Sequence, residues 1–158
     1  MARTIKISPS RAKLIWFLAA LFFFGEYFAR VAPSVTVTDL MQYFHVDAYQ
    51  LGSLSAFFYY AYVIMQIPVG ALVDRFGPKW LITLMSALCG VACLVFAFSS
   101  YFPLAQLCRF MMGFSAAFAF VGALKLATLW LPAKRFGFYA GATQALGMLG
   151  AALGEGPV

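Results

Sequence analysis

Five charged side chains lie within apolar stretches of the sequence: Glu26, Arg30, Arg109, Lys125 and Glu155. Burying a charge in apolar surroundings is costly unless the charge is paired or hydrated, so these residues are functional candidates. Glu26 and Arg30 are four residues apart and therefore share one helical face. The pair has two interpretations. It either neutralises itself so that its helix can be buried, or it places a proton-accepting carboxyl beside a fixed cation for an anionic substrate group.

Further polar residues could complete such a site. Arg109 and Lys125 are sixteen residues apart, about 160° around a straight helix, so both face one cavity only if their helix bends. A second stretch carries a polar stripe at helical spacing, which is either substrate-binding or bonds neighbouring helices. Its members are Ser55, Tyr59, Tyr62 and Gln66.

The composition does not fit a soluble protein. Hydrophobic residues make up 64% and charged residues 10% of 158 residues, and the mean hydropathy is +0.88. Soluble domains are about 45–50% apolar and about 25% charged. A soluble enzyme, a disordered chain and a disulfide-rich secreted domain are thereby excluded. The net charge of +6 does not indicate a nucleic-acid partner, because the basic residues lie between apolar stretches.

The apolar stretches predict an all-α integral membrane protein with about five spans. Each stretch has the roughly 20 residues that a helix needs to cross a bilayer. The predicted spans are 14–35, 50–72, 80–100, 103–131 and 136–158, after a basic N-terminal segment, 1–13. Lys and Arg flank the spans on one side only, which predicts a cytoplasmic N-terminus. The residues on that side are Arg3, Lys6, Arg11, Lys13, Arg75, Lys79, Lys134 and Arg135.

The sequence carries no signature of an enzyme, a metal site or a cofactor site. Cys89, Cys93 and Cys108 lie in or beside predicted spans and have no zinc-type spacing, so we interpret them as packing residues. His45 is a lone histidine in a predicted loop. We expect no catalytic residues, no metal and no cofactor.

The segment after the second predicted span resembles the GxLxDRxGRK signature of the major facilitator superfamily. The matching residues are Gly70, Leu72, Asp74, Arg75, Gly77 and Lys79, with Pro78 in place of the usual Arg. Arg109 and Gly113 resemble the RxxxG motif of the family's fourth span, and Trp130-Leu-Pro132 resembles a turn between its fourth and fifth spans. The resemblance implies five helices of a six-helix N-terminal half, with the second half of the fold outside this chain. It also implies a conformational loop motif, in which we expect Asp74 to pair with Arg135.

Phe28-Ala-Arg30 is similar to the first-span arginine of organic-anion and sugar-acid symporters in that superfamily. The similarity implies that Arg30 holds a carboxylate or phosphate and that a nearby acid, here Glu26, takes the coupling proton. Residues 150–155 lack the proline of the drug/proton antiporter pattern, which disfavours drug efflux.

The expected function is proton-coupled secondary transport of a small anionic solute across the plasma (inner) membrane, with this chain as an N-terminal fragment. The expected partners are the lipid bilayer, the solute, protons and the missing C-terminal half. The predicted substrate site comprises Arg30, Tyr59, Tyr62, Gln66, Arg109 and Lys125, with Glu26 for the proton. The alternatives are a non-transporting membrane scaffold or partner subunit, and transport of amino acids, sugars or drugs.

Overall fold

The computed structural model describes residues 8–156, and every regular element within them is a helix. Five long helices are α1 (Pro9–Val35), α3 (Ala48–Phe76), α4 (Pro78–Phe98), α5 (Phe102–Trp130) and α6 (Phe136–Gly154). A short helix α2 (Val37–Phe44) follows α1, and a single 3₁₀ turn η1 (Ala133–Arg135) precedes α6. The all-α prediction is confirmed.

Local sequence signals account for the main helix ends. The Ser8 hydroxyl accepts a hydrogen bond from the Arg11 amide at the start of α1. Asp47 and Gln50 form a reciprocal capping box that starts α3. At the end of α3, Gly77 has a φ of +83°, a conformation that favours glycine, and Pro78 then opens α4.

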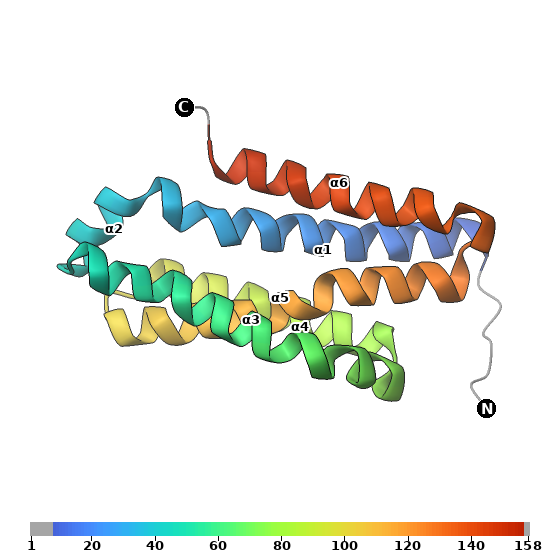
Figure 1. Cartoon of the computed structure of the whole chain (residues 1–158), viewed down its shortest axis with the longest axis horizontal. Helices are drawn as coiled ribbons and strands as arrows, with labels where there is room; N and C mark the ends of the chain where they lie inside the picture. Colours follow the sequence, from blue (N-terminus) through green and yellow to red (C-terminus); the bar gives the residue numbers. More distant parts are fainter. Residues whose placement is uncertain (1–7, 157–158) are drawn as a thin grey trace.

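The bundle is organised around α5, which packs against α1, α3 and α4 (Figure 1). α5 also has the most buried face of the four longest apolar helices. α6 packs along α1 on the side remote from α4 (Figure 1). Three glycines allow this contact, because a Cβ at each of them would meet α1 closely. They are Gly147 at the Phe23 ring, and Gly150 and Gly154 at the carbonyl oxygens of Phe24 and Phe28.

Within residues 8–156, four helices are long and apolar enough to cross a membrane: α1, α3, α4 and α5. α6 has 19 residues, about 28 Å of helix, and the fifth span stays a prediction. The structure begins α1 at Pro9, so residues 9–13 of the predicted basic segment extend the first helix. Arg3, Lys6 and Val158 lie outside the described residues.

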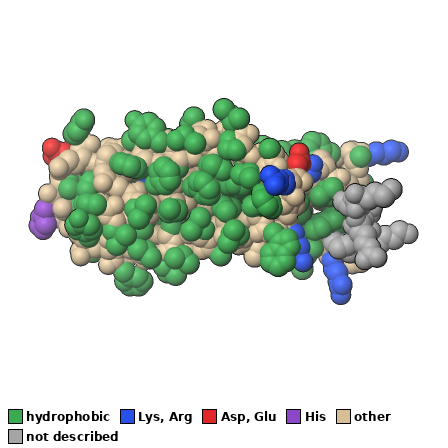
Figure 2. Space-filling model, turned by 90° about the horizontal axis from the view of Figure 1, so that it is seen from below, with side chains coloured by type: hydrophobic (Ala, Val, Ile, Leu, Met, Phe, Trp, Pro, Cys, Tyr) green, Lys and Arg blue, Asp and Glu red, His purple; other side chains and the backbone are tan. Residues whose placement is uncertain are grey.

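The helices define two ends, which we call the α2 end and the η1 end (Figure 1). Lys and Arg side chains gather toward one end of the molecule, and the histidine lies at the other (Figure 2). The sequence predicts no helix between the first two spans, 14–35 and 50–72, so α2 differs from that expectation. It forms because its apolar side packs on the nearby ends of α3, α4 and α5, where Phe44 is buried against Leu51, Leu54 and Ala105.

Candidate functional site around Glu26 and Arg30

Glu26 and Arg30 form an ion pair on one face of α1. The Arg30 Nη2 atom donates to the Glu26 Oε1 atom across one helical turn. The Glu26 side chain is 1% exposed and that of Arg30 is 13% exposed. The pair is therefore shielded from solvent, and the expectation that the two residues share a face is confirmed.

Only one of the two hydrogen bonds that a guanidinium and a carboxylate can form in parallel is present between Arg30 and Glu26. The second carboxylate oxygen, Glu26 Oε2, and the Arg30 Nε atom are buried and have no hydrogen-bond partner among the described residues. Arg–carboxylate pairs reach their full strength when two parallel hydrogen bonds form. The pair therefore retains one donor and one acceptor for a further polar group.

Four aromatic rings surround the Arg30 guanidinium. Its Cζ atom lies 4.5 Å from the ring centroid of Tyr27 and 4.6 Å from that of Tyr62. The corresponding distances are 5.5 Å for Phe58 and 6.0 Å for Tyr59. These distances fall within the range of cation–π attraction. The structure thus brings the predicted Tyr59 and Tyr62 to Arg30 and adds Tyr27 and Phe58, which the sequence did not single out.

Gln66 lies one helical turn beyond Tyr62 on α3 and is exposed. Because it follows Tyr62 toward the η1 end, it extends the polar stripe along the helix. Its place in the substrate site stays a prediction.

Arg109 was predicted to bind substrate, and this stays a prediction; the structure shows which protein groups its guanidinium contacts. It is 2% exposed and donates to backbone carbonyls of two other helices. Nη1 lies 2.8 Å from the Ala29 oxygen and Nη2 lies 3.4 Å from the Arg30 oxygen, both on α1. Nε lies 3.5 Å from the Leu54 oxygen on α3. The Arg109 guanidinium on α5 is therefore hydrogen-bonded to both α1 and α3.

Lys125 forms an ion pair with Asp74 and not with a residue of the Glu26–Arg30 site. Its Nζ atom lies 2.6 Å from the Asp74 Oδ1 atom, and both side chains are substantially exposed. The expectation that Asp74 pairs with Arg135 is wrong. α3 packs along α5, which brings Lys125 to Asp74, whereas Arg135 ends the turn before α6, a helix that packs mainly on α1.

The segment interpreted as a loop motif is mostly helical. Residues 70–76 belong to α3, Gly77 makes the turn, and Lys79 lies in the first turn of α4. Of its two glycines, only Gly77 has a positive φ. The motif therefore acts as the end of one helix and the start of the next, with Asp74 facing α5.

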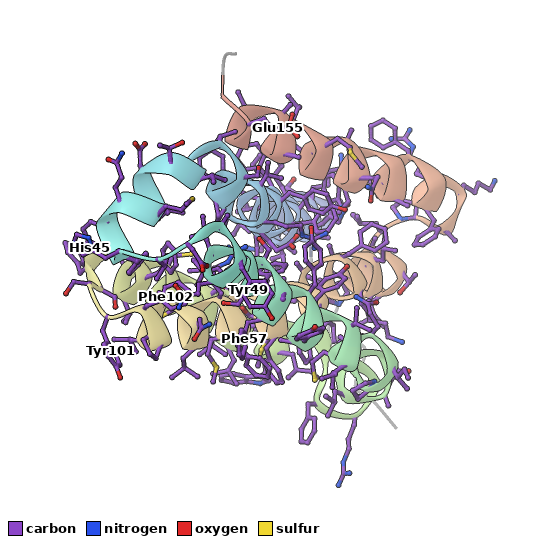
Figure 3. All side chains as sticks on the ribbon, turned by 60° about the vertical axis from the view of Figure 1, so that its left-hand side comes forward. His45, Tyr49, Phe57, Tyr101, Phe102 and Glu155 are labelled. Atoms are coloured by element: carbon purple, nitrogen blue, oxygen red, sulfur yellow. The ribbon has the colours of Figure 1, made fainter. Side chains whose placement is uncertain are left out.

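A separate groove of about 670 Å³ lies between α3 and α5 at the α2 end. Tyr49, Phe57 and Phe102 lie along it (Figure 3). Its polar lining includes Ser53 and Gln106, whose side chains are hydrogen-bonded to each other. The groove contains neither Glu26 nor Arg30 and lacks an acidic or basic side chain.

A comparison with protein families identifies the fold to which this geometry belongs. The model of the Major Facilitator Superfamily matches residues 15–158. The chain belongs to this superfamily. It is an integral membrane protein of a transporter family, and its helices correspond to part of the superfamily's N-terminal half.

Individual superfamily members show what the chain resembles. It is 34% identical over 125 residues to the uncharacterized transporter YybO of Bacillus subtilis, covering 77% of this chain and 29% of the relative. It is 32% identical over 133 residues to the probable sulfoacetate transporter SauU of Cupriavidus necator, covering 84% and 31%. It is 32% identical over 118 residues to the probable galactarate/D-glucarate transporter GarP of Escherichia coli, covering 71% and 27%. The chain thus spans less than a third of these superfamily relatives.

Proposed function

We propose that this chain supplies the first helices of a secondary active transporter that moves a small polar anion together with protons. The observation that carries the proposal is the buried Glu26–Arg30 pair, in which one donor and one acceptor remain unused. Charged side chains at membrane depth are rare and are functional candidates, and the spare Arg30 donor can hydrogen-bond an anion. The matching relatives span more than this chain, so the activity belongs to a complete protein.

Arg30 supplies the fixed positive charge. A guanidinium stays protonated and can hold a carboxylate, sulfonate or phosphate with two hydrogen bonds, which a lysine cannot do. Sulfoacetate and galactarate, named for two relatives, are anions of this kind. Their chemistry supports a small organic anion as the substrate class for this chain too.

Glu26 supplies the proton site. Its carboxylate and the substrate anion compete for the same guanidinium, because Arg30 Nη2 already bonds Glu26 Oε1. Protonating Glu26 releases that competition, and binding an anion at Arg30 favours the protonated acid. Linkage makes these effects reciprocal, so anion and proton bind cooperatively. That cooperation is the thermodynamic basis of symport.

The proposed setting is the plasma (inner) membrane, with the N-terminus in the cytoplasm. It rests on the one-sided distribution of Lys and Arg along the sequence. The relatives described above are named as transporters, which supports transport and not catalysis as the activity.

Uptake into proteoliposomes containing the complete transporter tests the proposal. Galactarate, sulfoacetate and a panel of amino acids and sugars serve as probes, with and without an inward proton gradient. We expect uptake of an anion that the gradient accelerates. Arg30→Lys should lower uptake at least about tenfold, since the bidentate contact is lost.

Glu26→Gln should retain exchange of internal for external anion but lose accumulation driven by the proton gradient. Tyr60→Leu, an exposed change on α3 directed away from Arg30, is the matched control. If Arg30→Lys transports normally and Glu26→Gln still accumulates solute, the pair only neutralises itself within α1. Absence of any uptake by the complete protein would favour the membrane scaffold alternative.

A further inference from the structure

The aromatic residues around Arg30 have a role that the ion pair alone does not require. We propose that Tyr27, Phe58 and Tyr62 form an aromatic clamp that holds the Arg30 guanidinium in place while Glu26 is protonated. The inference rests on the function proposed above and assigns these three as positioning residues. They act through Arg30, whose position determines where an anion binds.

The clamp is built from two helices. Tyr27 precedes Arg30 by three residues on α1, so its ring lies on the same face as the guanidinium. Phe58 and Tyr62 are one turn apart on α3, and their rings are nearly parallel at 12° with centroids 6.4 Å apart. Arg30 therefore contacts rings from its own helix and from the neighbouring helix. Phe58 is 1% exposed, which gives the clamp a fixed base.

Protonation of Glu26 removes the charge that holds Arg30. The hydrogen bond from Nη2 then has a neutral acid as its acceptor, and such bonds are weaker than those to a carboxylate. The Cζ atom of Arg109 lies 4.7 Å from the Phe58 centroid, so a second cation lies close to the same ring. Without the carboxylate, repulsion from Arg109 opposes the position of Arg30, so other contacts must hold the guanidinium there.

The remaining polar surroundings do not replace the carboxylate. The charged and titratable side chains near the pair are Tyr27, Tyr59, Tyr62, Arg109 and the thiols Cys89 and Cys93 on α4. α6 packs on α1 and has no Asp, Glu, Lys, Arg or His within Phe136–Gly154. Attraction of a cation to a ring face does not depend on the proton of Glu26, and it strengthens when water is excluded. The rings therefore remain the stabilising contacts in the protonated state.

Chemical modification of arginine tests the clamp without any substrate. Phenylglyoxal reacts with accessible guanidinium groups, and mass spectrometry of the purified 158-residue chain in detergent reports the rate at Arg30. The exposed Arg75 is the internal reference in every sample. Glu26→Gln imitates the protonated acid. We expect Glu26→Gln alone to change the Arg30 rate by less than about threefold, because the rings still hold the guanidinium.

Adding Tyr62→Leu to Glu26→Gln should raise the Arg30 rate roughly thirtyfold, the scale of a desolvated cation–ring contact. Tyr62→Phe in the same background should leave the rate as in Glu26→Gln, since the ring remains. Tyr27→Leu and Tyr27→Phe give a second, independent pair of variants. Tyr60→Leu, exposed on the other side of α3, should have no effect.

The inference is overturned if Glu26→Gln alone exposes Arg30, or if the Leu and Phe variants react alike at both tyrosines. A thermal melt of each variant shows whether a raised rate reflects unfolding, in which case Arg109, buried in the core, gains reactivity as well. The labelling result is independent of uptake. Normal transport by Arg30→Lys would remove the proposed function and leave the clamp standing, whereas a failed labelling pattern would remove the clamp alone.

Discussion

Arg109 donates a 2.8 Å hydrogen bond to the carbonyl oxygen of Ala29, the atom that Pro33 leaves without a helical donor. In a regular helix that oxygen would accept from the amide of residue 33, and proline has no amide hydrogen. Pro33 lies inside α1, so a side chain from α5 satisfies a backbone acceptor on α1. The contact fixes the segment that carries Arg30.

Arg109→Leu should lower the free energy of unfolding by about 2–4 kcal/mol, since it leaves buried carbonyls without a donor. Adding Pro33→Ala should recover part of this loss, because the new amide can bond Ala29. Thermal unfolding of the detergent-purified chain measures both effects, with the exposed change Arg11→Leu as the control. Equal stability of Arg109→Leu with and without Pro33→Ala would contradict this relationship.

The close packing of α6 on α1 is tested by replacing glycines of α6 with alanine. A Cβ at Gly150 would overlap the carbonyl oxygen of Phe24, whereas one at Gly141 meets nothing within 4 Å. We expect Gly150→Ala to lower the free energy of unfolding by at least about 2 kcal/mol through overpacking. Gly141→Ala, on the same helix, should be neutral or stabilising by up to about 1 kcal/mol. Equal melting temperatures for the two variants would show that α6 does not pack on α1 as described.

The pairing of Asp74 with Lys125 is tested by exchanging charges. Both side chains are partly solvated, so Asp74→Lys should change the free energy of unfolding by less than about 1 kcal/mol. We expect the same change to slow uptake several-fold in the complete transporter, and Lys125→Asp to restore part of the rate. Combining Asp74→Lys with Arg135→Asp should restore nothing. Rescue by the Arg135 exchange would return that residue to its sequence-predicted role.

Membrane orientation is tested with single cysteines in a chain whose three native cysteines are replaced by alanine. Ala48 begins α3 at the α2 end and Phe76 ends it at the η1 end, and both are exposed. A cysteine at position 48 should react with an impermeant thiol reagent applied outside intact cells, and one at position 76 only after permeabilisation. The reverse pattern would invert the proposed topology.

The sequence predicted the long helices well because their signals are local. Asp47 before Ala48 and Gly77 before Pro78 mark ends of α3 that depend on neighbouring residues alone. Helix α2 was missed because its eight residues are too few to cross a bilayer, and the other helices were predicted as membrane spans. It depends on burying Phe44 against residues from other helices, and that contact cannot be derived from spacing.

In the candidate site too, contacts within one helix could be predicted from the sequence, whereas contacts between helices could not. The Glu26–Arg30 contact follows from a spacing of four on one helix, and the sequence predicted it. The partners of Arg109 and Asp74 come from other helices, so they depend on which helices pack together. Phe58 was missed for that reason. Tyr27 could have been found, since it precedes Arg30 by three residues on the same helix.

The two buried arginines differ in what they need when the chain is synthesised. Arg30 has its counter-charge on its own helix, so this part of α1 can enter a bilayer with its buried charges paired before any other helix exists. Arg109 has its acceptors on α1 and α3, both of which leave the ribosome before α5. Each buried arginine is therefore synthesised together with, or after, the groups that accept its hydrogen bonds. A permuted chain that began with α5 would present Arg109 to the translocon with no acceptor available.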